Sequence, residues 1–456
     1  MALAQRFAAA GRSLYLVGGS VRDALLGRHR EEEEHDFATD ARPPEVRRIV
    51  AGWADEVFTV GEAFGTIGLI KDGVIAEITT FRAEVYREDT RKPSVEFSDD
   101  LEIDLSRRDF TVNATALRLL PEPQIVDPFG GLADLGASLL RPPLDAAISF
   151  EDDPLRMLRL FRFVSTLGFE AAAETVEAVA GMRERLRIVS AERIRDELDK
   201  LLLGEHVERG LWGLVNSGLA GEFLPEIIAL RLEQDPLHQH KDVLAHTIAV
   251  VGNCPPDRIV RLAALFHDVG KPATRSLGPS GTTFHHHEAA GARITRDRMR
   301  ELRYSKDDVR DVTQLVYLHL RPHTLKMGWT DRAVRRYVRD AGPLLDRLNV
   351  LVRCDVTTRN PKKARAVSNR IDDLENRISV VRQQEELDSL RPPIDGHAVM
   401  SYLGIGPGPM VGEAMRMLLE HRIDHGPYTE EEAFALVGKW AGKAGARGPE
   451  GSTARA

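Results

Sequence analysis

The segment from Leu14 to Asp23 constrains the fold of this chain more than any other part of the sequence. A short apolar run, Leu14–Val17, is followed at once by Gly18-Gly19 and then by Ser20, which can cap a helix. This order predicts a buried strand, a tight glycine turn and a helix start, and therefore a small α/β unit. Glycine lets a backbone come close to a ligand, and a helix start carries positive potential, so the turn predicts a phosphate-binding site.

Two carboxylates come next in the sequence. Glu34 and Asp36 are two positions apart at the start of a predicted strand, His35–Thr39, so both side chains point to the same face. Mg²⁺ binds one or two carboxylates together with phosphate oxygens of a substrate. The pair therefore predicts a magnesium site that holds a nucleoside triphosphate, and Glu77 on a later predicted strand is a candidate third ligand.

Arginines near these groups complete the predicted site. Arg22, in the first turn after the glycines, is expected to meet triphosphate oxygens, and Asp23 is expected to orient it. A dense cluster of arginine and aspartate follows at 107–109. Each feature alone has an ordinary explanation: a common turn, a solvated acidic face, or a surface ion-pair network. Their order on one small α/β unit favours a single site.

The composition limits the class of protein. Hydrophobic content of 43% and charged content of 29% are those of a globular protein, and no apolar run reaches the ~18 residues that span a bilayer. The net charge of −8 does not exclude nucleic-acid binding, which needs only a local basic stripe. Cys254 and Cys354 form no disulfide framework and no secretory signal is evident. We therefore expect a reduced, cytoplasmic protein with no membrane partner; the sequence does not indicate an oligomeric state.

The predicted elements change in kind along the chain. A hairpin is expected from Thr66–Ile70 and Val74–Phe81, turned at Asp72-Gly73, whereas Thr111–Leu119 fits either a strand or a helix. After Asp153, apolar positions recur at helical spacing, and a long charged helix is expected over 362–390. The Gly-, Ala- and Arg-rich end is expected to be disordered.

These motifs resemble those of tRNA nucleotidyltransferases, the CCA-adding enzymes of the bacterial and eukaryotic class, a family that also contains bacterial poly(A) polymerases. The match follows the family's order over roughly the first half of the chain, through segments 18–27, 36–39, 77–82, 104–114, 127–131, 153–159 and 192–202. The resemblance implies a polymerase-β-like α/β head followed by a largely α-helical neck and body. It implies addition of C, C and A to tRNA 3′ ends from CTP and ATP, with release of pyrophosphate, by a two-metal mechanism that uses Mg²⁺.

The resemblance also assigns roles to residues. Glu34 and Asp36 would be the catalytic, Mg²⁺-binding carboxylates, and Asp153 and Arg156 would read the incoming base. An acceptor beside a donor fits cytosine and adenine, and it conflicts with uracil and guanine, which place a carbonyl where the amino group should be. The other expected nucleotide-binding residues are Gly18, Gly19, Arg22, Arg107, Arg108, Asp109, Asn113 and Arg159.

One position departs from the family pattern, which has Asp-x-Asp where this chain has Glu34-His35-Asp36. Glutamate keeps the charge and can still hold Mg²⁺. Because it is longer by one methylene, the departure affects how much of the metal coordination residue 34 provides. Glu33 is an alternative ligand if the register shifts. The segment Tyr86–Pro93 resembles the flexible loop of full CCA-adding and A-adding members, which disfavours a CC-adding enzyme.

A second group of residues resembles a different superfamily. His-Asp followed by Val-Gly-Lys at 267–271 is similar to the HD phosphohydrolases, whose pattern is His…His-Asp…Asp. By that match, the ligands of a divalent transition metal are His246, His267, Asp268 and Asp355. A second ion is expected to be supported by His319 with His286 or His287. Relatives carry this domain as a phosphohydrolase or as a scaffold that holds tRNA.

The expected organisation is a nucleotidyltransferase head (1–148), a helical neck with the base-recognition motif (149–232), an HD metal-binding domain (233–360), a helical tail (361–441) and a disordered end (442–456). Two alternatives use the same chemistry: an enzyme that adds only A or only CC, and a poly(A) polymerase. An HD-domain phosphohydrolase with an inactive head is an alternative of a different class. The intact set of site residues argues against a non-catalytic RNA-binding module.

Overall fold

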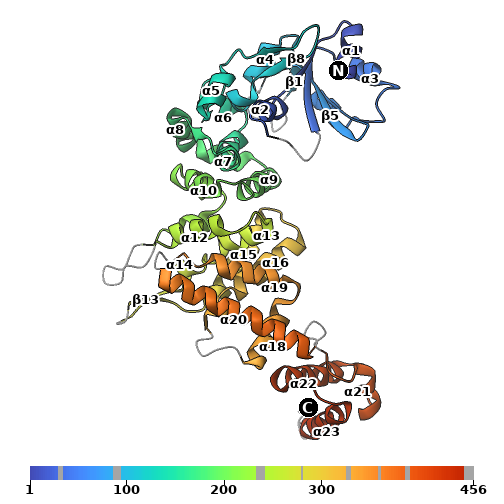
Figure 1. Cartoon of the computed structure of the whole chain (residues 1–456), viewed down its shortest axis with the longest axis vertical. Helices are drawn as coiled ribbons and strands as arrows, with labels where there is room; N and C mark the ends of the chain where they lie inside the picture. The colour runs from blue at the N-terminus through green and yellow to red at the C-terminus, as the bar shows by residue number, and fades with distance from the viewer. Residues whose placement is uncertain are drawn as a thin grey trace, which may run out of the picture. The chain divides into compact units, whose positions relative to one another are not determined.

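The computed structural model of the chain describes residues 1–28, 34–85, 94–232, 242–278, 281–324, 330–357, 361–385 and 391–445 (Figure 1). The chain forms two compact units, one made of Met1–Arg231 with Arg298–Tyr304 and the other of Leu232–Asp297 with Ser305–Ala456. Among the described residues, no helix combines the length and the apolar character that crossing a membrane requires.

A seven-stranded sheet forms the centre of the head, in the order β3-β4-β5-β2-β1-β8-β9. These strands are β1 (Leu14–Val17), β2 (Glu34–Thr39), β3 (Glu56–Phe58), β4 (Thr66–Lys71), β5 (Val74–Thr80), β8 (Ala116–Arg118) and β9 (Gln124–Val126). Among the described strands of this sheet, β2 and β5 form the one parallel pair, and its register sets Asp36 beside Glu77. The α/β head expected from the sequence is therefore confirmed.

The local predictions for the head are largely confirmed. The hairpin of β4 and β5 turns at Asp72 and Gly73, whose φ angles of 52° and 81° are those of a two-residue turn that matches strand twist. The segment Thr111–Leu119, which fitted either a strand or a helix, divides into a short 3₁₀ turn, η2 (Thr111–Asn113), and strand β8.

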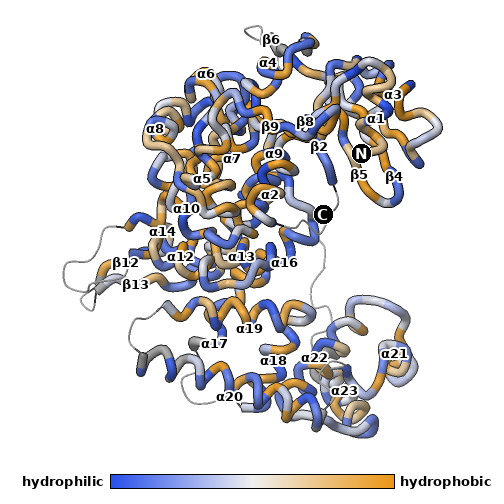
Figure 2. The backbone as a smooth tube through the Cα atoms, turned by 45° about the horizontal axis from the view of Figure 1, so that its top comes forward, coloured by the Kyte–Doolittle hydropathy of each residue, from blue (hydrophilic) through white to orange (hydrophobic). Residues whose placement is uncertain are grey.

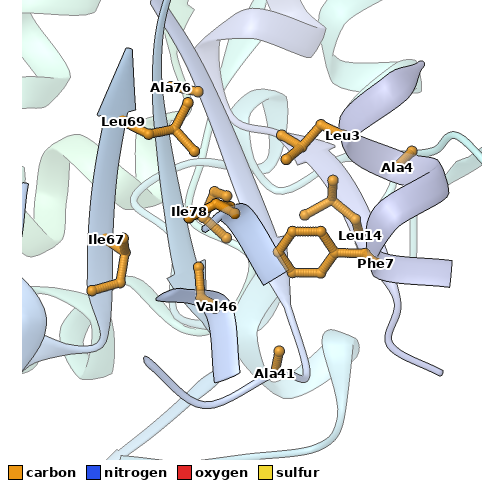
Figure 3. Packing of buried hydrophobic residues seen from close by; sticks show 11 residues of the cluster. Leu3, Ala4, Phe7, Leu14, Ala41, Val46, Ile67, Leu69, Ala76 and Ile78 are labelled. Atoms are coloured by element: carbon orange, nitrogen blue, oxygen red, sulfur yellow. The ribbon is translucent and has the colours of Figure 1, made fainter. Parts of the chain in front are cut away.

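One face of the sheet is covered by helices α1 (Ala2–Ala9) and α3 (Pro43–Val50). Figure 3 shows Leu3 and Phe7 of α1 pointing toward Ile78 of β5, and all three are buried. Because side chains alternate along a strand, Glu77 points to the opposite face from Ile78. The acidic residues of β2 and β5 therefore lie on the face that α1 and α3 leave uncovered.

The neck continues the first unit as a group of helices: α6 (Ala146–Asp152), α7 (Leu155–Leu167), α8 (Ala173–Met182), α9 (Ala191–Leu202) and α10 (Val207–Asn216). Helix α7 is buried along most of its length. It approaches α10 closely because that helix presents glycine: a Cβ at Gly213 would lie 2.3 Å from a ring atom of Phe161. This packing fixes the start of α7, where the base-recognition motif is expected.

The second unit is helical, with one short hairpin, β12 (Arg275–Gly278) and β13 (Gly281–Phe284). The helices that form its main body include α12 (Val243–Asn253), α13 (Arg258–Phe266), α15 (His287–Glu301), α16 (Lys306–Leu318), α18 (Asp331–Ala341), α19 (Leu345–Cys354) and α20 (Pro361–Glu385). Helix α20 confirms the expected long charged helix, and Figure 2 shows its alternation of hydrophilic and hydrophobic positions. Its buried stripe is Ile371, Leu374, Ile378 and Val381.

The tail contains α21 (Gly396–Leu403), α22 (Pro409–His425) and α23 (Glu430–Gly445), which share their own apolar cluster. The sequence places the start of a disordered end at 442, whereas α23 continues to Gly445. Residues 442–445 are therefore helical. Residues 446–456 lie outside the described residues, as do the Tyr86–Pro93 segment and Glu33.

Candidate functional site

A polar pocket in the first unit brings together most of the residues that the sequence singles out. Its lining comprises Val17, Gly18, Gly19, Asp36, Phe37, Thr66, Glu77, Thr79, Arg82, Asp104, Arg107, Arg108, Asp109, Asn113, Asp153, Arg156, Arg159 and Arg193. Eleven of the predicted nucleotide or metal ligands are among them: Gly18, Gly19, Asp36, Glu77, Arg107, Arg108, Asp109, Asn113, Asp153, Arg156 and Arg159. Of the described residues, Arg22 and Glu34 were predicted to belong but do not line it.

The glycine turn forms one wall of the pocket. Gly18 has φ 69° and ψ −137°, a backbone conformation that is essentially restricted to glycine. A Cβ at this position would lie 2.9 Å from Nη1 of Arg108 and 3.8 Å from Oδ2 of Asp36. The turn therefore brings the backbone against both a cation and a carboxylate of the pocket. Ser20 does not cap the helix as expected, because α2 (Gly19–Leu25) already begins at Gly19.

Carboxylates converge on the sheet face beside this turn. Asp36 and Glu77 are register partners on β2 and β5, and both line the pocket. Burial raises the pKa of Glu77, and the charges of Asp36 and Glu34 raise it further against the opposing charge of Arg82. Glu34 is exposed at the start of β2, and its side chain lies outside the pocket lining. Its charge nevertheless acts on Glu77. A group of like charges of this kind favours a bound cation.

Arg108 is the pocket guanidinium nearest the glycine turn. Its Nη2 contacts Oδ2 of Asp104 at 3.3 Å, and the other oxygen of Asp104 accepts the backbone N–H of Arg82 at 3.3 Å. Nε of Arg108 is buried and has no hydrogen-bond partner among the described residues. Asp104 and Arg82 were not predicted as site residues, although both lie in motif segments that the sequence carries.

Asp109 is the centre of a buried network below the pocket. Its Oδ2 accepts Nε of Arg159 at 2.9 Å and Nη2 at 2.5 Å, while its Oδ1 accepts Nδ2 of Asn113 at 2.9 Å. Burial opposes ionisation of Asp109, but the charge of Arg159 and the hydrogen bond from Asn113 outweigh it and hold the pKa of Asp109 well below its usual value. Asp109 is therefore an ionised anchor for two other residues of the pocket.

The network also holds Arg22, which was predicted to meet triphosphate oxygens. Its guanidinium is buried, donates to Oδ1 of Asp23 at 2.8 Å and donates to Oδ1 of Asn113 at 2.7 Å. The carboxylate of Asp23 turns the side chain inward, as expected for an orienting group. Arg22 therefore holds Asn113 through this hydrogen bond, and it is not among the residues that line the pocket.

The predicted base-recognition pair lies at the junction of α6 and α7. Asp153 follows the last residue of α6, and its Oδ1 accepts the backbone N–H of Leu155 at 3.1 Å. Arg156, in the first turn of α7, donates to Oγ of Ser149 at 2.9 Å and to the backbone oxygen of Arg107. An acceptor and a donor are therefore held side by side on the pocket wall.

A second residue group, in the second unit, forms the expected HD centre. Nε2 of His246 on α12 lies 2.9 Å from Oδ1 of Asp355 and 3.3 Å from Nε2 of His267, at the end of α13. His267 Nε2 lies 3.2 Å from Oδ2 of Asp268. Burial disfavours the charged form of His267, but the carboxylates of Asp268 and Asp355 outweigh it and raise the pKa of His267 to about 9.

A second cluster adjoins the first through Asp268. Oδ1 of Asp268 lies 3.4 Å from Nε2 of His287. With His319, these two residues form a buried group of three whose ligand atoms lie within 4.8 Å of one another. Nε2 of both His287 and His319 is buried without a hydrogen-bond partner in the described part of the chain. Burial and the neighbouring His267 lower the pKa of His319 to about 3. Between the two candidates for this position, the structure selects His287, because the side chain of His286 is 87% exposed.

The other ring nitrogens orient the histidines for metal binding. Nδ1 contacts a backbone oxygen in three cases: Ala264 for His267, Phe284 for His287 and Val316 for His319. Such contacts fix the tautomer and direct Nε2 toward a metal. The nitrogen and carboxylate donors suit a divalent transition ion, and Cys354 is in neither cluster found among the described residues.

Three segments of the chain match family models. Residues 14–141 match the poly A polymerase head domain, residues 168–230 match the "Probable RNA and SrmB- binding site of polymerase A", and residues 243–360 match the HD domain. These segments contain the metal ligands of the second unit and all of the pocket lining of the first except Asp153, Arg156 and Arg159, which lie between the first two segments.

Whole proteins are similar as well. An A-adding tRNA nucleotidyltransferase of Deinococcus radiodurans is 32% identical over 441 residues, which cover 93% of this chain and 95% of that enzyme. The CCA-adding enzyme of Bacillus pumilus is 42% identical over 224 residues, which cover 49% of this chain and 54% of that enzyme. The high identity to the latter is thus confined to about half of each chain.

Solved structures share the fold. The Bacillus stearothermophilus CCA-adding enzyme in complex with CTP matches with a TM-score of 0.71 at 24% identity, over 98% of both chains. The Thermotoga maritima CCA-adding enzyme complexed with tRNA matches with a TM-score of 0.60 at 18% identity, over 96% of this chain and 94% of that one. With the near full-length similarity to the Deinococcus enzyme, these findings identify the chain as a nucleotidyltransferase of the tRNA CCA-adding and poly(A) polymerase family that carries an HD domain.

Proposed function

We propose that this chain completes tRNA 3′ ends by adding C, C and A from CTP and ATP and releasing pyrophosphate. The observation that carries the proposal is a single pocket lined by the carboxylates Asp36 and Glu77, the guanidinium of Arg108, and the Asp153–Arg156 pair. These groups supply the three functions that template-free nucleotide addition requires: a metal seat, a triphosphate seat and a base-reading edge.

The carboxylates of β2 and β5 would hold Mg²⁺. When bound there, Mg²⁺ lowers the pKa of the attacking 3′-hydroxyl and neutralises the leaving pyrophosphate. Asp36 and Glu77 present carboxylate oxygens into the pocket, and Glu34 adds negative charge from the start of β2. We therefore assign the main metal contacts to Asp36 and Glu77, and a lesser share to Glu34 than Asp-x-Asp members give to the equivalent residue.

The phosphates and the ribose would occupy the arginine side of the pocket. The buried Nε of Arg108 offers a donor to a triphosphate oxygen, and Arg107 lies next to it. Asn113 and Arg159, which Asp109 holds in place, line the adjoining part of the pocket, where the ribose would lie. Donors fixed before the substrate arrives stabilise developing charge without further reorganisation.

Base selection would come from Asp153 and Arg156. The acceptor oxygen of Asp153 matches the exocyclic amino group of cytosine or adenine, and the guanidinium of Arg156 matches the ring nitrogen beside it. Uracil and guanine would set a carbonyl against the carboxylate, and mismatched polar groups of this kind are strongly rejected. Asp153→Ala is therefore expected to relax base choice more than it weakens tRNA binding.

The test is incubation of the protein with labelled CTP, ATP or both, using tRNA that lacks the 3′ triplet and, in parallel, tRNA that already ends in CC. We expect two C residues followed by one A. Incorporation of A alone, and only on tRNA that already ends in CC, would instead assign the activity of the Deinococcus relative; a stop after two C residues or long A tails would assign the other partial activities. Asp36→Asn is the matched inactive variant, and activity unchanged by it would contradict the metal assignment.

We also propose a second function, metal-dependent phosphoester hydrolysis at the HD centre. The observation in its favour is a pair of adjoining clusters, joined by the 3.2 Å contact between His267 and Asp268. The second cluster has buried imidazole nitrogens that can bind a metal. We expect p-nitrophenyl phosphate or its diester to be hydrolysed when Mn²⁺, Co²⁺ or Ni²⁺ is added, and His267→Ala to abolish this activity. Asp36→Asn should leave the hydrolysis intact, and loss of hydrolysis in that variant would contradict two independent sites.

A further inference from the structure

We propose that Arg193 is a positioning residue for base selection, which acts by holding the carboxylate of Asp153 in one orientation. The inference rests on the proposed base recognition by Asp153 and Arg156. Arg193 is 40 residues away from Asp153 in the sequence, on a different helix, and its side chain lines the same pocket.

The contact is direct. Nη2 of Arg193, in the first turn of α9, lies 2.8 Å from Oδ2 of Asp153, while Oδ1 of Asp153 accepts the backbone N–H of Leu155. Each oxygen of the carboxylate thus has one tether, and each keeps acceptor capacity, since a carboxylate oxygen has two lone pairs. The tethers therefore fix the plane of the carboxylate without using up the acceptor that a base amino group needs.

The position of Arg193 is itself well fixed. The side chain of Ser190 caps α9 and accepts the backbone N–H of Arg193 at 3.4 Å. Helix α9 packs against α7, and Leu198 and Leu201 on its inner face are fully buried. The guanidinium of Arg193 therefore projects from a rigid element toward the α6–α7 junction.

Stability does not explain this ion pair. The side chain of Arg193 is 54% exposed and that of Asp153 is 24% exposed. Ion pairs with this exposure contribute little to folding stability. Arg156, the partner of Asp153 in base recognition, is already held by Ser149 and by the backbone oxygen of Arg107. Arg193 thus fixes the acceptor, Asp153, in the way that these contacts fix the donor, Arg156.

Orientation matters because base selection compares an amino group with a carbonyl at one point. A carboxylate that turns away accepts the correct base less well and opposes the wrong one less strongly. Sites of this kind need their groups held to about 0.5 Å and 10–20°. Loss of one tether should therefore reduce discrimination about tenfold, with little effect on the chemical step.

The experiment compares Arg193→Ala with the wild type and with Arg187→Ala. Arg187 is a matched control: it belongs to the same unit, its side chain is 63% exposed and it pairs with Glu222 at 2.7 Å, away from the pocket lining. For each protein we would measure KM and kcat for CTP and ATP, the incorporation of UTP and GTP, and the melting temperature.

For Arg193→Ala we expect KM to rise about three- to tenfold, kcat to stay within twofold, and the preference over UTP and GTP to fall about tenfold. Arg193→Lys, which keeps one cationic donor, should restore part of the preference. Combined with Asp153→Ala, the Arg193 substitution should have no further effect, because it acts through that carboxylate.

Unchanged discrimination in Arg193→Ala, or the same change in Arg187→Ala, would overturn the inference. Additive losses in the double variant would overturn it as well, since they require a role independent of Asp153. If Arg193→Ala lowers the melting temperature, Arg193→Lys and Arg193→Gln supply the comparison. A wild-type protein that accepts all four nucleotides equally would refute the proposed base recognition instead, so the two failures are distinguishable.

Discussion

Replacement of Gly18 by alanine tests whether the glycine turn positions the pocket. The φ of 69° and ψ of −137° at Gly18 belong to a region that is strained for every other residue, at a cost of order 1–3 kcal/mol. The new Cβ would also lie 2.9 Å from Nη1 of Arg108, a separation that real Cβ atoms do not show. The variant therefore has two separate effects, one on the backbone and one on a pocket side chain.

The two effects act on different quantities. Backbone strain lowers the melting temperature. The clash falls on the mobile end of the Arg108 side chain, so the guanidinium can move away at little cost in stability, but its 3.3 Å contact with Asp104 is then disturbed. A displacement of about 1 Å at a substrate-positioning group can reduce activity about 100-fold. We therefore expect a modest loss of stability and a loss of kcat/KM of that order.

Gly11→Ala separates the two effects. Gly11 has the same φ of 69°, but in the described part of the chain no atom lies within 4 Å of its Cβ position. This control carries a positive-φ cost of roughly 1–2 kcal/mol without a clash. The assay is nucleotide incorporation into tRNA lacking its 3′ end, with thermal unfolding of each variant in parallel. Equal activity in the two variants would refute the reasoning that Gly18 is required by its neighbours.

Three further substitutions test other parts of the chain. Asp109→Asn should destabilise the protein by about 1–3 kcal/mol at pH 7, since it removes the carboxylate charge next to Nε and Nη2 of Arg159 and leaves Arg159 with the longer 3.4 Å contact to Glu197. Because the folded-state pKa of Asp109 is lowered, this advantage of the wild type should be complete above about pH 5 and shrink as the pH falls. A melting-temperature difference that does not shrink in acid would contradict it. Ser149→Ala removes a 2.9 Å contact to Arg156 and should raise misincorporation of UTP and GTP several-fold in the same nucleotide assay, with unchanged fidelity as the contrary result. His319→Ala should reduce the bound Mn²⁺ or Ni²⁺ by one ion per chain in elemental analysis, whereas the exposed His286→Ala should not, and equal stoichiometry in both would argue against the second cluster.

Much of the head was predictable because its signals are local. An apolar run before Gly18, two carboxylates at alternate strand positions, and the Asp72-Gly73 turn each depend on a few adjacent residues, and each element formed where the sequence placed it. The order of these motifs also predicted that most of the residues lining the pocket would come together, although not Arg82 or Asp104. The Glu77 contact followed less directly, since it needs the parallel register of β2 and β5.

The directions and long-range contacts of side chains were less predictable. Arg22 and Arg108 are both arginines in motif segments, yet one is buried under Asn113 and the other faces the pocket. No periodicity distinguishes them, because the difference depends on a contact between residues 91 positions apart. His286 and His287 likewise differ only in backbone conformation: His286 has a φ of 61°, and the helix that turns His287 inward begins one residue later.

The charged groups of the buried network under the pocket are paired with one another. The charged groups at the surface of the pocket are therefore the ones that can bind a ligand. Arg22, Arg159 and Arg162 are opposed by Asp23, Asp109 and Glu197, so the positive and negative charges of this layer balance. The ring of Phe163 lies among the three guanidinium groups, with Arg162 at 3.6 Å from its centroid. A layer whose charges balance adds no net charge beneath the pocket. Under the proposed function, the negative charge of a triphosphate would be met by Arg107, by Arg108 and by cations held at Asp36 and Glu77. Substitutions in the network should therefore reduce stability and activity together, whereas substitutions at Asp36 or Arg108 should reduce activity alone.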